Sequence, residues 1–152
     1  MTTVVCAGDG TLSNGLYKGI ACDAELVLLK VQDANGKITT ENIVKALQWV
    51  IEHHRQYGIR VVNMSVSDDE VISYTQSETD KLVEQLEKAG ITVVAAVGND
   101  EKGAIKPPAN SPAAIAVGGI DDANNLHEGG WKLYHSSYGS TVDALMKPEL
   151  IA

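Results

Sequence analysis

Phenylalanine is absent from this chain of 152 residues, and aromatic side chains make up only 5% of it. A hydrophobic core must therefore be built from small and aliphatic side chains, and the 44% share of hydrophobic residues is enough for one. Cysteine is scarce as well: Cys6 and Cys22 are too few for a disulfide framework, and they form no Cys-x-x-Cys pair. We interpret both as free thiols, which suit a reducing compartment.

Positive charge is also in short supply. The chain has 20 acidic residues against 12 lysines and arginines, which gives a net charge of −8. Nucleic acids and anionic membrane surfaces select for basic patches, so we expect neither as a partner. No apolar run approaches the roughly 18–20 residues that span a bilayer, and residues 1–6 lack the basic side chains typical of a signal peptide. We predict a cytoplasmic protein, and secretion of a longer parent protein stays open.

The hydrophobic pattern changes between the strand and the helix period several times along the chain. It predicts strands at residues 25–31, 59–66, 91–97 and 114–120, with helices at 39–57 and 77–89 and polar loops at 67–76, 106–112 and 121–130. A threonine cap and Gly58 delimit the first helix, and Ser77 with Asp80 fits a capping box for the second. This alternation is typical of an α/β fold with a mostly parallel sheet and helices packed on it.

Functional residues of such a sheet are expected at the carboxyl ends of its strands. The segments at those ends are residues 35–36, 65–67 and 98–100. Asn99 stands out, because a carboxamide N–H at a strand tip can donate a hydrogen bond to an oxyanion. On the residues alone, a turn-forming asparagine is the alternative.

Other catalytic and metal motifs are missing. The sequence has no Gly-x-Ser-x-Gly and no His-Glu-x-x-His, and its histidines lack the spacing of zinc ligands. His53 and His54 fall near a helix C-terminus, where a cation complements the dipole, and His127 falls in a polar loop. No cofactor is required by this pattern. The oxygen-rich run from Asp9 to Asn14 could hold a structural calcium ion, with a plain turn as the alternative.

Several segments, taken together, resemble the middle of a subtilisin-like serine protease, a subtilase. Val-Asn-Met-Ser-Val at 62–66 is similar to a strand of that family, and Val-Val-Ala-Ala-Val-Gly-Asn at 93–99 is similar to its oxyanion strand. Further matching segments follow the family's order: residues 12–21, 108–112, 115–118, 136–139 and 147–152. The resemblance covers essentially the whole chain and is closest to the intracellular bacterial branch.

The resemblance implies a three-layer, subtilisin-like α/β fold, incomplete here, with residues 1–152 as one partial catalytic domain. It implies peptide hydrolysis through an acyl-enzyme, with Asn99 as the oxyanion donor. It also implies a substrate cleft, whose wall residues fall into two groups. Those of the primary specificity pocket are Ser65, Val66, Ser67, Ala96, Val97 and Gly98, and those of the edge that pairs with a substrate strand are Gly36, Lys37 and Ile38. Ser67 replaces the family's usual glycine, which narrows the expected pocket entrance.

The chain departs from the family in its triad. The family's Asp has no counterpart, its His-Gly-Thr motif would fall before Met1, and its Gly-Thr-Ser-Met-Ala motif would fall beyond Ala152. We therefore expect a fragment of a serine endopeptidase that acts on peptide or protein substrates and is inactive alone.

Two other function classes stay open. One is a non-catalytic α/β module that binds peptides or partners. The other is a flavodoxin-like domain for small ligands, which the absence of a glycine-rich phosphate loop weakens. The missing family segments would leave one sheet face partly bare, so we also expect a homodimer.

Overall fold

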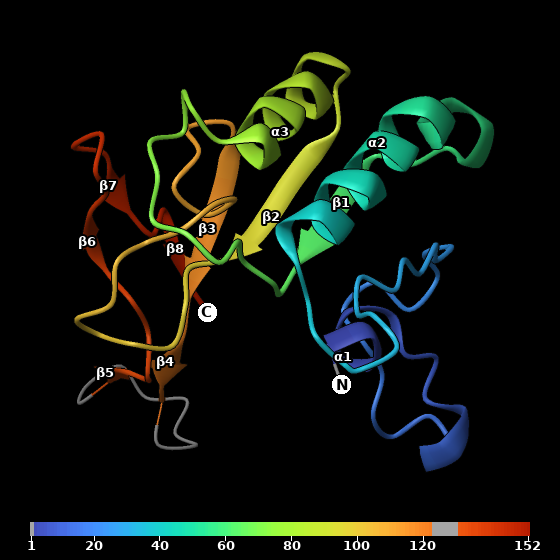
Figure 1. Cartoon of the computed structure of the whole chain (residues 1–152). Coiled ribbons are helices and arrows are strands. Elements are labelled where there is room, and N and C mark those ends of the chain that lie inside the picture. Colours follow the sequence, from blue (N-terminus) through green and yellow to red (C-terminus); the bar gives the residue numbers. More distant parts are fainter. Residues whose placement is uncertain (1, 123–130) are drawn as a thin grey trace. The chain divides into compact units, whose positions relative to one another are not determined.

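The computed structural model describes residues 2–122 and 131–152 (Figure 1). The chain divides into two compact units, Met1–Lys30 (unit 1) and Val31–Ala152 (unit 2). His127 and most of the polar loop predicted at 121–130 lie outside the described residues.

Unit 1 contains the short helix α1 (Thr2–Ala7) and the 3-10 turn η1 (Thr11–Ser13). The strand predicted at residues 25–31 is wrong. Its residues have no regular secondary structure, and Leu26 and Leu28 are 49% and 71% exposed. A strand is stable only when its backbone hydrogen-bonds to a neighbouring strand. In the described part of the chain, this apolar run pairs with no such neighbour.

Unit 2 begins with a bridge between Gln32 and Ile38 and continues into helix α2 (Thr40–Tyr57). As predicted, Thr39 caps this helix by accepting a hydrogen bond from the Asn42 backbone N–H, at 3.3 Å. Gly58 ends it in the left-handed region, with φ 63°. The buried stripe consists of Ile43, Val44, Leu47 and Val50, so the predicted periodicity is confirmed.

Helix α3 (Glu78–Lys88) forms where the second capping pattern predicts it. Ser77 Oγ accepts a hydrogen bond from the Asp80 backbone N–H at 3.1 Å. After the C-cap Ala89, Gly90 adopts φ 79° and turns the chain toward the sheet. The apolar side of α3 is fully buried through Leu82, Val83 and Leu86.

The sheet is parallel throughout, as the alternation of strands and helices predicts. Its order is β1-β2-β3-β8, with β1 at Val61–Met64, β2 at Thr92–Ala96, β3 at Ala114–Gly118 and β8 at Leu150–Ile151. Two small antiparallel pairs join β4 (Ile120–Asp121) to β5 (Lys132–Leu133) and β6 (Gly139–Ser140) to β7 (Met146–Lys147).

Both long helices of unit 2 pack on the same face of this sheet (Figure 1). Their stripes enclose one core with Met64, Val93 and Ala114. On the opposite face Val61 and Leu150 are 60% and 56% exposed. Unit 2 therefore shows a helix layer and a sheet layer, and one face is partly bare, as expected. No helix among the described residues combines the length and the apolar character that a membrane crossing demands.

Candidate functional site

The carboxyl ends of the neighbouring strands β1 and β2 lie side by side at the same end of the sheet. Met64, the last residue of β1, is in register with Ala95 of β2. Residues 65–67 therefore leave the sheet next to residues 96–99, which is the arrangement that the sequence predicts for a site at the carboxyl ends of parallel strands.

The side chains of these two segments divide into exposed and packed ones. Val66 is half-buried against the core formed by α2 and α3, and Val97 is buried in a smaller apolar cluster with Ala116. These two anchor the segments to the sheet. The exposed members, which remain available to a ligand, are Ser65, Ser67, Ala96, Gly98 and Asn99.

The loop that carries Asn99 is clamped by Ser137. The Ser137 backbone N–H donates to the Gly98 carbonyl at 3.1 Å, and its hydroxyl donates to the Asp100 carbonyl at 2.7 Å. The Asp100 backbone N–H donates in turn to Ser137 Oγ at 3.2 Å. Both chain neighbours of Asn99 are thus fixed, while its own side chain stays exposed. Sequence reasoning used Ser137 only as part of a family motif and missed this role.

Glycine is required at position 98. Its φ is 116°, in the left-handed region, and a Cβ there would lie 2.7 Å from Ser137 Oγ. The close approach of Ser137 is therefore possible only because residue 98 has no side chain.

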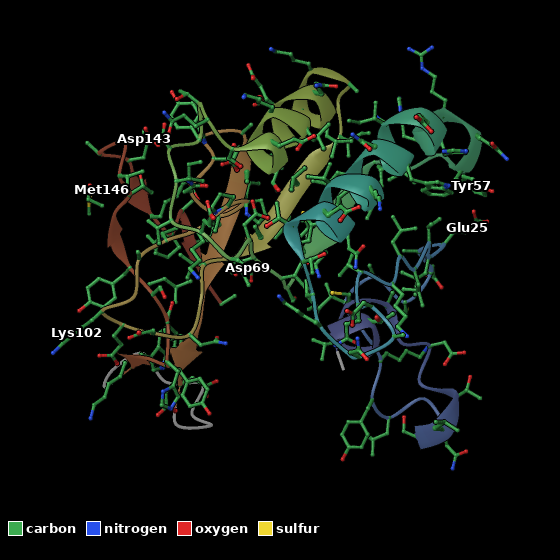
Figure 2. The ribbon with its side chains drawn as sticks, in the orientation of Figure 1. Glu25, Tyr57, Asp69, Lys102, Asp143 and Met146 are labelled. Carbon is green, nitrogen blue, oxygen red and sulfur yellow. The ribbon has the colours of Figure 1, made fainter. Side chains whose placement is uncertain are left out.

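A surface hollow of about 310 Å³ adjoins Asn99. Its lining residues are Asn99, Asp100, Glu101, Lys102 and His135. Figure 2 shows Lys102 extending away from the ribbon. The hollow is polar and open, and it lies on the loop after β2 rather than at residues 65–67.

The predicted substrate edge lies on a tight turn. Asp33 Oδ1 accepts hydrogen bonds from the Asn35 and Lys37 backbone N–H groups at 2.9 and 2.8 Å, and Gly36 has φ 80°. Gly36 and Lys37 are exposed, whereas Ile38 is half-buried against the core of unit 2. The turn's own hydrogen bonds occupy the backbone N–H groups of Gly36 and Lys37 and the Lys37 carbonyl, just before α2 begins.

The predicted calcium run in unit 1 forms a compact turn. Asp9 accepts hydrogen bonds from the Thr11 backbone N–H at 2.9 Å and from the Thr11 hydroxyl at 2.6 Å. These bonds lower the pKa of Asp9. The Gly10 carbonyl accepts from the Ser13 and Gly15 backbones, and Asn14 is left-handed with φ 51°. A cation here would compete with these donors, and the calcium site stays a prediction.

Sequence reasoning missed two buried acids, Asp68 directly after the segment 65–67 and Asp80 in α3. Asp68 is 6% exposed and Asp80 is 2% exposed. Burial raises the pKa of both carboxyl groups, and it raises that of Asp80 to about 7. The capping pattern predicted the backbone bond of Asp80 but gave no signal of its burial.

The comparisons with known proteins agree on one family. A family model described as the subtilase family matches residues 1–152. The chain is 32% identical over 160 residues to the serine protease AprX of Bacillus subtilis (strain 168), a match that covers 97% of this chain and 36% of that protein. It is 33% identical over 126 residues to Subtilisin Savinase of Lederbergia lenta, covering 82% of this chain and 41% of that protein.

A solved structure supports the same assignment. Sphericase superposes with a TM-score of 0.71 at 26% identity, over 90% of this chain and 43% of that one. The chain thus spans less than half the length of these relatives. Since the family match extends over every residue of the sequence, this chain belongs to the subtilase family.

Proposed function

We propose that this chain is a part of a subtilisin-like serine endopeptidase, the part that supplies the oxyanion donor and the walls of the substrate cleft. In such an enzyme a Ser-His-Asp triad hydrolyses the peptide bond through an acyl-enzyme. The sequence contains neither a His-Gly-Thr nor a Gly-Thr-Ser-Met-Ala motif. The proposal therefore places the triad elsewhere in the enzyme.

The placement of Asn99 is the observation that carries this proposal. Its exposed carboxamide stands at the end of β2, and its backbone neighbours are clamped by Ser137. A donor that is already fixed in place stabilises a developing oxyanion without reorganising at the moment of reaction. Residues 65–67 leave the neighbouring strand at the same edge, where a substrate side chain could be held.

The resemblance to the family's substrate edge at residues 36–38 supports a peptide or protein as the substrate, and a peptide that pairs there must replace the turn's own hydrogen bonds. An extended peptide can add to exposed backbone as a further strand, with affinity from main-chain hydrogen bonds. The net charge of −8 agrees with a partner other than nucleic acid or an anionic membrane surface.

The test replaces Asn99 in the protease of which we propose this chain is a part. Asn99→Leu should lower kcat by about 10²–10³-fold, because one oxyanion donor is lost, and should leave KM nearly unchanged. The matched control is Gln48→Leu, which removes an exposed carboxamide on α2. An Asn99→Leu enzyme with the kcat of the control would refute the proposed role.

The chain alone should be inactive, because no serine in it is paired with an activating base by a recognised motif. A fluorophosphonate probe should leave every serine unlabelled, and stoichiometric labelling would overturn this expectation. If the chain is instead a non-catalytic binding module, peptides should still bind to it without being hydrolysed. Asn99→Leu should then change only the affinity for the peptide.

We further propose that the chain alone forms a homodimer through the bare face of its sheet. Val61 and Leu150 are exposed there, and Val94, Ile115 and Val117 are half-buried. Large apolar patches rarely stay exposed in a soluble monomer. Light scattering over a dilution series should give twice 16.2 kDa, and a folded monomer at every concentration would contradict the proposal.

We propose a cytoplasmic location, supported by the two free cysteines, of which Cys6 is exposed. Cell fractionation of the source organism should recover the protein with cytoplasmic markers, and its recovery from the culture medium would contradict this.

A further inference from the structure

Helix α3 begins with a buried acid whose carboxyl oxygens form no close hydrogen bond. Asp80 is 2% exposed, and neither of its carboxyl oxygens has a partner among the described residues. Ser77 Oγ accepts from the backbone N–H of Asp80 and caps the helix. Burying a carboxylate without donors costs free energy, which the group avoids by holding a proton.

Three charged groups from other parts of unit 2 interact electrostatically with Asp80. Asp68 lies in the loop after β1, Asp143 in the loop before β7, and Lys147 in β7 itself. The two acids oppose ionisation of Asp80, whereas the nearby Ser77 hydroxyl and Lys147 favour it. The Lys147 ammonium, however, is already bonded to two backbone carbonyls and a carboxylate. Burial is the largest influence, and the balance keeps Asp80 protonated in acid and titrating near neutral pH.

Asp68 links this acid to the pocket segment at residues 65–67, which it follows directly. Thr79, the neighbour of Asp80 in α3, donates from its hydroxyl to Asp68 Oδ1 at 2.9 Å. The Asp68 backbone N–H donates to the Pro107 carbonyl at 2.9 Å. Asp68 thus anchors the start of the loop 67–76.

Asp143 anchors the far part of the same loop. Its carboxylate accepts a hydrogen bond from the Ser73 hydroxyl at 2.6 Å and one from the Tyr74 backbone N–H at 2.9 Å. Figure 2 shows Asp143 beside this loop. Both anchors of the loop 67–76 are therefore carboxyl groups that interact electrostatically with Asp80.

We propose that Asp80 is a positioning residue whose proton holds the loop 67–76 in place and, through Asp68, the pocket segment 65–67. When Asp80 loses its proton, it repels Asp68 and Asp143, and its charge favours exposure to water. The loop then opens. The regulation of substrate binding that follows rests on the proposed function, whereas the opening of the loop does not.

The experiment measures amide hydrogen exchange of this chain by NMR, at the two backbone N–H groups that fasten the loop, those of Asp68 and Tyr74. The protection factor of each amide, which is its intrinsic exchange rate divided by its observed rate, should fall about tenfold per pH unit between about pH 5 and pH 7, because opening of the loop releases one proton from Asp80. It should level off above that range. Asp80→Asn should abolish the dependence, and Glu78→Gln, which changes an exposed acid in the same helical turn, should keep it.

Protection that is independent of pH in the wild type, or an unchanged pH dependence in Asp80→Asn, would overturn the proposal. If Asp80→Asn does not fold, carbon-13 NMR of the wild-type aspartate carboxyls decides. A buried aspartate that titrates near pH 7 supports the proposal, and titration of every aspartate near its ordinary pKa of about 4 overturns it. None of these measurements uses catalysis, so a failure here is separate from a failure of the proposed function.

Discussion

Lys147 is a buried cation that fastens the end of the chain to the sheet. It is 3% exposed, and its ammonium donates to the Ser111 carbonyl at 2.7 Å, to the Ala114 carbonyl at 3.1 Å and to Glu149 Oε1. Glu149 Oε2 accepts from the Ala116 backbone N–H at 2.7 Å, so the pair joins the segment before β8 to β3. We predict that Lys147→Met strongly destabilises unit 2.

The magnitude follows from what the substitution leaves behind. Two carbonyls lose charge-assisted hydrogen bonds worth about 1.5–3 kcal/mol each. The ion pair adds little, since the Glu149 side chain is 39% exposed and solvent screens it. Breaking a largely buried charge arrangement typically costs about 3–5 kcal/mol, and we expect a loss within that range. For a chain of this length it lowers Tm by about 6–20 °C.

The assay is urea unfolding followed by circular dichroism, together with a thermal melt. Lys45→Met is the matched control, because Lys45 pairs with Glu41 on the exposed side of α2 and its side chain is 65% exposed. That control should lose less than about 0.5 kcal/mol. A Lys147→Met protein as stable as the control would refute the reasoning.

Three further predictions follow from single features. Folding raises the pKa of Asp80 from 3.8 to about 7, so its stabilising contribution is full below about pH 4 and is lost as the pH rises to about 7. In urea unfolding, the free energy of unfolding of the wild type should therefore fall by up to about 4 kcal/mol relative to that of Asp80→Asn over this pH range. A difference between the two proteins that stays constant with pH would contradict this. Gly98→Ala should lower the free energy of unfolding by more than about 1 kcal/mol in the same assay. The loss should exceed that of Gly36→Ala, where a Cβ meets nothing within 4 Å. Equal losses of stability in the two variants would refute the contact with Ser137. If the turn from Asp9 to Asn14 binds calcium, millimolar Ca²⁺ should raise Tm above a Mg²⁺ control by linkage, and no shift would count against the site.

The sequence predicted the two long helices well because their signals are local. The Thr39 cap, the Gly58 stop and the stripe through Leu47 all act within a few turns of one helix. The parallel sheet was predictable for a related reason: buried strands that alternate with such helices have few other ways to pair.

The errors came from interactions between distant residues. The apolar run at 25–31 has the composition of a buried strand, but whether it becomes one depends on a neighbouring strand that local pattern cannot specify. The electrostatic interaction of Asp80 with Asp143 likewise joins residues that lie far apart in sequence. Ser137 reaches the loop around Asn99 from 37 residues away.

The most direct test of the central claim, that the strand ends of this chain form a peptide-binding cleft beside an oxyanion donor, is an NMR titration of the isotope-labelled chain. The ligand is a capped tetrapeptide at millimolar concentrations. We expect chemical-shift changes at residues 36–38, 65–67 and 96–99, including the amide signals of the Asn99 side chain. The exposed helix surface around Gln48 should stay unchanged. Shift changes confined to other surfaces, or none at saturating peptide, would contradict the claim.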